Sequence, residues 1–114
     1  MKKIVEQGLL YDFYGELLTE HQKEVYEAAV YNDMSLTEIA DENGISKQGV
    51  HDLIKRCTNT LQGYEDSLHM IRRFEAIKRE AEQLNMLADS DDFSNEELRS
   101  RMRSISGRII EELT

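Results

Sequence analysis

Six side chains that could contact a nucleic acid lie close together near the middle of the 114-residue chain. They are Ser46, Lys47, Gln48, His51, Lys55 and Arg56. A glutamine amide can form two hydrogen bonds with an adenine edge, while lysine and arginine bind guanine or phosphates. Side chains of these types on one helix are typical of a helix that enters the major groove of DNA. The segment therefore predicts nucleic-acid binding, the one biochemical activity for which the sequence carries a local signal.

Two short helices crossing at a tight turn must position these side chains, and residues 35–56 have the spacing of such a helix-turn-helix. Gly44 falls at the turn, where the backbone needs a residue that tolerates a positive φ. Ser46 can cap the second helix by accepting hydrogen bonds from its first backbone N–H groups. Apolar residues then recur at spacings of four and three, at Val50, Ile54 and Cys57. This spacing predicts one buried face on the second helix.

The composition and the apolar pattern predict an all-α fold. The chain has no proline, and residues with high helix propensity dominate it. The pattern predicts about six helices, near residues 3–17, 19–32, 35–43, 46–57, 62–88 and 94–113. Three of these helices begin with a Ser or Thr that is followed three residues later by Glu or Gln, at Thr19, Ser35 and Ser94. That arrangement is typical of a capping box, which fixes where a helix begins.

The predicted helices divide into a helix-turn-helix head, residues 1–60, and a C-terminal extension, residues 61–114, made of a long helix and a final amphipathic helix. The long helix carries an apolar stripe at Met70, Phe74, Ile77, Ala81, Leu84 and Ala88. Heptad-like spacing is typical of helices that pair along a seam, and helix-turn-helix proteins commonly bind paired half-sites as dimers. We therefore predict a homodimer whose interface is formed by the C-terminal helices. The alternative is an intramolecular hairpin between the long helix and the final one.

The charge balance weighs against DNA as the partner. The chain has 23 acidic and 14 basic residues and a net charge of −9, and an acidic protein repels phosphates at long range. Residues 46–57 differ, because they carry three bases and only one acid, Asp52. In the final helix, four arginines follow one another with no acid between them: Arg99, Arg101, Arg103 and Arg108. These arginines either pair with the acidic stretch 89–97 or hold a nucleic-acid backbone or an acidic partner.

Several classes of function find no support in the sequence. No apolar run reaches membrane-spanning length, and no secretion leader opens the chain. A single cysteine, Cys57, fits a reducing compartment, so we expect a cytoplasmic protein. His21, His51 and His69 have no metal-ligand spacing, and no glycine-rich phosphate loop or nucleophile motif is present. We therefore expect no enzyme, no metal or other cofactor, and no small-molecule substrate.

Four segments carry a resemblance to a known family. Residues 19–56, and above all M-S-L-T-E-I-A-D-E-N-G-I-S-K-Q-G-V at 34–50, resemble the promoter-reading C-terminal domain of bacterial sigma factors. L-L-Y-D-F-Y-G-E-L-L-T, V-H-D-L-I-K-R and L-Q-G-Y-E-D-S-L-H resemble the small YlxM-like helix-turn-helix proteins over most of the chain. One departure from the sigma pattern is Leu53, where sigma domains usually carry a basic residue, and another is Asp52, where they carry a neutral one.

The resemblance implies an all-helical, sigma-like protein that binds DNA and has a link to the signal recognition particle pathway. The leading hypothesis is therefore a DNA-binding regulatory protein that reads DNA through residues 46–57. The alternative is a protein- or RNA-interaction accessory of the signal recognition particle, which docks a basic partner on its acidic surface and binds no DNA.

Overall fold

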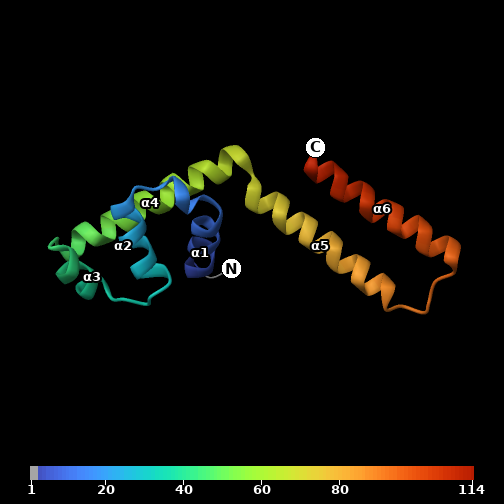
Figure 1. Cartoon of the computed structure of the whole chain (residues 1–114), viewed down its shortest axis with the longest axis horizontal. Helices are drawn as coiled ribbons and strands as arrows, with labels where there is room; N and C mark the ends of the chain where they lie inside the picture. Colours follow the sequence, from blue (N-terminus) through green and yellow to red (C-terminus); the bar gives the residue numbers. More distant parts are fainter. Residues whose placement is uncertain (1–2) are drawn as a thin grey trace. The chain divides into compact units, whose positions relative to one another are not determined.

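The computed structural model describes residues 3–114, which form helices joined by short loops (Figure 1). The elements are α1 (Lys3–Tyr14), the 3₁₀ turn η1 (Gly15–Leu17), α2 (Glu20–Val30), α3 (Leu36–Asn43), α4 (Lys47–Leu68), α5 (Met70–Ala88) and α6 (Asn95–Leu113). No strand occurs in this part of the chain. The predicted all-α fold is confirmed, and the helices form two compact units that divide after His69.

The beginnings of the helices follow the predicted caps. Thr19 and Ser35 each accept a hydrogen bond from the backbone three residues on, and Gln22 and Glu38 return a bond to the cap. Ser94 also caps its helix, by accepting from the N–H of Glu97 at 3.2 Å. There the Glu97 carboxylate accepts from the Ser94 hydroxyl, so the reciprocal bond to the backbone found in the other two boxes is replaced by a side-chain bond.

The core of the first unit lies where α2, α3 and α4 meet. Val25, Ile39 and Val50 contribute one fully buried side chain from each helix. Ala28 and Ala40 complete this cluster, and their small side chains allow the helices to approach closely. Burying aliphatic side chains contributes about 1.5–3 kcal/mol for each residue. The crossing of α3 and α4 is therefore held by packing as well as by the turn between them.

Helix α1 joins this core through polar contacts to the second half of α4. The Gln7 side chain donates to the Thr58 hydroxyl at 3.3 Å, and the Tyr14 hydroxyl donates to Glu65 at 2.5 Å. Thr58 also lies 2.9 Å from the hydroxyl of the buried Tyr26 on α2. These bonds hold the second half of α4 against both N-terminal helices, beyond the end of the helix-turn-helix motif.

Two helix boundaries differ from the predicted ones. The first helix ends at Tyr14 and is followed by η1, and the helix predicted at 62–88 is two helices. Helix α4 continues to Leu68 because Leu61, one turn beyond Cys57, is still fully buried in the first unit. His69 then ends α4 in a left-handed conformation with φ of 57°. A boundary between residues 60 and 61 would fall inside this helix.

The second unit is a hairpin of α5 and α6, which run side by side in opposite directions (Figure 1). Ile105 is its most buried side chain, and the Arg108 guanidinium donates to Glu80 across the hairpin at 2.9 Å. The long helix and the final helix therefore pair within one chain. Among residues 3–114, none of the helices combines the length and apolar character needed to cross a membrane.

Candidate nucleic-acid interface

The turn before α4 presents the start of this helix to solvent. Gly44 closes α3 with a φ of 65°, and its N–H bonds the carbonyl of Ala40. Ser46 then caps α4 by accepting from the N–H of Gly49 at 2.9 Å. The predicted roles of both residues in the turn are confirmed. Ser46 is therefore a structural cap, and its hydroxyl hydrogen remains available to a ligand.

The other five predicted residues are all exposed on α4. Because consecutive helical residues are about 100° apart around the axis, Lys47, Gln48, His51 and Lys55 fall within an arc of about 100°. Arg56 lies about 100° beyond Lys55, on the flank of this arc. Val50 and Cys57 point the opposite way, into the core. The structure thus brings four of the six residues onto one solvent-facing surface, which we call the α4 surface.

Asp52 modifies the α4 surface through its contacts with two of the residues there. The Gln48 side-chain amide donates to the Asp52 carboxylate at 2.9 Å, and the His51 Nδ1 lies 3.6 Å from the same carboxylate. One of the two hydrogens that Gln48 would offer to a base is therefore in use. The i to i+4 spacing of a Gln and an Asp is the signal in the sequence that could have revealed this bond.

The cations of the α4 surface and of its flank are not neutralised by the protein. Within the described part of the chain, no carboxylate lies within 4.0 Å of Lys47, Lys55 or Arg56. These side chains can therefore bind phosphates without first breaking an ion pair. The arrangement can supply two lysines and an arginine for a backbone, with a Gln and a His between the lysines for base edges.

The predicted dimer stripe is divided by the hairpin. Ile77 and Leu84 are half-buried beside α6, whereas Ala81 and Ala88 are exposed. Met70 and Phe74, at the start of α5, are 47% and 48% exposed. One edge of the stripe therefore packs within the hairpin, and the other edge is exposed.

The arginines of α6 do not pair with the acidic stretch 89–97. Arg108 bonds Glu80 of α5, and Arg101 lies over the ring of Phe93 with 4.2 Å between Cζ and the ring centroid. Arg99 and Arg103 form no ion pair with any residue between 3 and 114. The predicted pairing of these arginines with residues 89–97 is therefore wrong.

Cys57 is a core residue and not a reactive thiol. It is 1% exposed, and burial raises the pKa of its thiol above the usual range, so the thiolate is disfavoured. Residues 3–114 contain no group of three His, Cys, Asp or Glu side chains placed to hold a metal ion.

Comparison with known proteins assigns the chain to a family. A family model described as "Putative helix-turn-helix protein, YlxM / p13 like" matches residues 1–101. The chain belongs to the UPF0122 family. The UPF0122 protein STH1464 of Symbiobacterium thermophilum is 43% identical over 94 residues, which cover 82% of this chain and 88% of that protein. A UPF0122 protein of Bacillus thuringiensis is 34% identical over 105 residues, covering 92% and 96%. The resemblance drawn from the motifs is thus confirmed at the level of the family.

Proposed function

We propose that this UPF0122 protein is a regulatory protein that binds duplex DNA through the α4 surface and has no catalytic role. The observation that carries the proposal is the surface itself. Lys47, Gln48, His51 and Lys55 share one exposed arc at the start of a helix that follows a tight turn. In helix-turn-helix proteins this part of the second helix contacts base edges in the major groove.

The sigma-like character of the head supports this orientation. The resemblance of residues 19–56 to a promoter-reading domain implies that α4 is the recognition helix and α3 the helix that crosses the backbone. The packing of α2, α3 and α4 around Val25, Ile39 and Val50 gives this pair a rigid base. Rigid support favours binding, because little conformational entropy is then lost on the DNA.

Homodimerisation through the second unit is part of the same proposal. The side chain of Glu80 bonds α6 and so marks the side of α5 that faces this helix. Around the axis of α5, Ala81 and Ala88 are rotated from Glu80 by about 80–100°. The buried Ile105 marks the side of α6 that faces α5. Around the axis of α6, Met102 and Leu113 are rotated from Ile105 by about 60–80°, in the same rotational direction. Because the two helices are antiparallel, these positions fall on one side of the hairpin, which we call the apolar face. A second copy could cover it and place two α4 surfaces on paired half-sites.

A second candidate function is supported by the charge. A net charge of −9 and the carboxylate of Asp52 beside Gln48 both oppose a polyanion. The family resemblance implies a link to the signal recognition particle, so the second candidate is an accessory that docks a basic protein of that particle or its RNA. In this role the protein binds its partner through its acidic surface, and the α4 surface binds no DNA.

A salt titration of binding to duplex DNA separates the two candidates. For the first, affinity falls as salt rises. The Lys47→Glu, Lys55→Glu double variant should bind far more weakly and should reduce the slope of log K against log[salt] by about two. The matched control is Lys78→Glu, Arg79→Glu, an equal charge change on α5 that should alter binding far less. No DNA binding at low salt, with binding of the purified particle protein or its RNA, would contradict the first candidate and support the second.

A further inference from the structure

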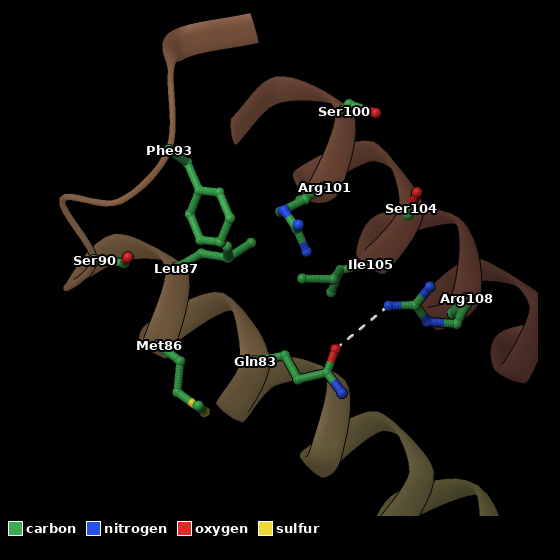
Figure 2. A pocket seen from close by; sticks show the side chains of 10 residues that line it. All are labelled: Gln83, Met86, Leu87, Ser90, Phe93, Ser100, Arg101, Ser104, Ile105 and Arg108. Atoms are coloured by element: carbon green, nitrogen blue, oxygen red, sulfur yellow. Dashed lines mark hydrogen bonds between the residues drawn. The ribbon is translucent and has the colours of Figure 1, made fainter. Parts of the chain in front are cut away.

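A groove of about 500 Å³ lies on the side of the hairpin opposite to the apolar face, between the end of α5, the following loop and α6 (Figure 2). Leu87 and Ile105 form its apolar part, Phe93 stands at one side, and Arg101 and Arg108 reach in from α6. Ligand sites commonly have a volume of about 300–1,000 Å³ and combine apolar walls with a few polar groups. The groove has both properties.

Arg101 is held by the aromatic ring and not by an acid. Its Cζ is 4.2 Å from the centroid of Phe93, and no carboxylate of the described residues lies within 4.0 Å of its guanidinium. This contact leaves the guanidinium N–H groups and the side turned away from Phe93 for a ligand. A guanidinium cannot lose its charge in a protein, so this position favours an anion.

Arg108 supplies a second group to the same groove. It lies two helical turns after Arg101, which is about 10 Å along the axis of α6. Its Nε donates to Glu80 at 2.9 Å. A terminal nitrogen donates to the side-chain oxygen of Gln83 at 3.4 Å, as Figure 2 shows. These bonds fix its position and neutralise it in part. Arg101 therefore supplies an unpaired positive charge to the groove, whereas Arg108 supplies a hydrogen-bond donor in a fixed position.

We propose that this groove binds a nucleotide, with its phosphate on Arg101 and Arg108 and its base stacked on the open face of Arg101. A guanidinium fork matches phosphate oxygens, and bases stack on arginine planes as well as on aromatic rings. Leu87 and Ile105 give the sugar and base an apolar surface. The nucleotide is either free or part of a single strand.

Titration of the full-length protein by calorimetry, with adenosine 5′-monophosphate as the probe, tests this site. Adenosine 5′-monophosphate should bind at least about tenfold more tightly than inorganic phosphate or adenosine alone, because each of these keeps only half of the contacts. Arg101→Gln should weaken it about tenfold or more. Arg101→Lys should also weaken it, because the charge is kept while the stacking plane is lost.

Arg103→Gln is the matched control, since it makes the same change two residues away on the same helix, outside the groove. It should leave the affinity within about twofold, and circular dichroism should show equal helix content in all variants. Equal weakening by Arg103→Gln, or no binding of adenosine 5′-monophosphate at millimolar concentration, would overturn the proposal. Binding of an acidic peptide in its place, with the same dependence on Arg101, would also overturn it.

A short oligoadenylate distinguishes the two sources of the nucleotide. Tighter binding of the oligonucleotide, with the same dependence on Arg101, supports a single strand as the source, and tighter binding of the monophosphate supports a free nucleotide. The Lys47→Glu, Lys55→Glu variant should keep full affinity for the monophosphate. Failure of this site and failure of the DNA proposal are therefore separate results.

Discussion

The side-chain amide of Gln48 donates a hydrogen bond of 2.9 Å to the carboxylate of Asp52, one turn further along α4. The same carboxylate lies beside His51. An anion thus stands among the residues proposed to face DNA, and it holds the one amide suited to an adenine edge. The pair lowers the affinity that the lysines would otherwise provide, and it restrains Gln48 in one position.

Removal of this carboxylate should strengthen DNA binding. Asp52→Ala removes one repulsive charge and frees the Gln48 amide, so we expect the affinity for duplex DNA to rise by about three- to tenfold at low salt. Asp66→Ala is the control, because Gln62 donates to Asp66 at the same distance of 2.9 Å in the same helix. Fluorescence anisotropy should show a gain for the first variant alone. Equal gains would mean that only the total charge matters.

Alanine substitutions at two glycines should change the free energy of unfolding in opposite directions. Gly44 has a φ of 65° and no atom within 4 Å of an added Cβ, so Gly44→Ala should lower the free energy of unfolding by about 1–2 kcal/mol through backbone strain alone. Gly63 lies inside α4 with equally open space, and Gly63→Ala should raise it by about 0.5–1 kcal/mol. Urea denaturation measures both changes. A neutral Gly44→Ala would be inconsistent with the left-handed turn.

The Cys57 thiol should be protected from modification. It is buried in the first unit and its pKa is raised by that burial, so a thiol reagent can attack only after α4 opens. Ellman's reagent should react in the native protein at least about a hundredfold more slowly than in urea. Native labelling as fast as that of the unfolded chain would mean that α4 separates readily from α1 and α2.

Stability should fall at alkaline pH because of two tyrosines. Burial, followed by hydrogen bonds to Glu27 and Asp12, raises the pKa values of Tyr11 and Tyr31 above the usual value of about 10. In this range the unfolded chain loses protons that the folded chain keeps. The stability contributed by these groups is therefore complete below about pH 10 and is lost as the pH rises above it.

Urea midpoints measured from about pH 9 to pH 11 test this expectation. The Tyr11→Phe, Tyr31→Phe variant should lose less stability over this range than the unmodified protein does. Burial also raises the pKa of Tyr26, so some pH dependence should remain in the variant. Parallel curves for the two proteins would show that neither hydroxyl contributes.

Charged substitutions at two methionines should show which face of the hairpin forms the dimer interface. Met102 lies on the apolar face and is 51% exposed, whereas Met86 borders the groove on the other side and is 72% exposed. Met102→Glu should convert a dimer to a monomer in sedimentation velocity, because a charge would be buried without a partner. Met86→Glu should leave the dimer intact. A dimer lost only in the Met86 variant would place the interface on the groove side.

Local signals predicted the parts of the fold that depend on neighbours within about four residues. The caps at Thr19, Ser35 and Ser46 and the turn at Gly44 belong to this class, since each satisfies backbone groups close by in the chain. The end of α4 at His69 does not, because the burial of Leu61 against distant helices decides how far the helix continues.

The candidate sites show the same limit. The exposed residues of α4 could be found from the helical period alone. The groove could not, because Phe93 lies in a loop without a regular pattern, and the path of that loop decides whether its ring meets Arg101. Nor could the partner of Arg108, since Glu80 lies 28 positions earlier in the chain.

The bonds that join α1 to α4 have a consequence for the order in which the chain folds during synthesis. Gln7 and Tyr14 find their partners at Thr58 and Glu65, each 51 residues later. Because a nascent chain emerges from its N-terminus, α1 leaves the ribosome before its partners on α4 exist. Until they appear, it can form only its contacts with α2, such as the bond from the Tyr31 hydroxyl to the Gly8 carbonyl. The first unit closes only when the second half of α4 appears, whereas the hairpin needs nothing earlier than Met70.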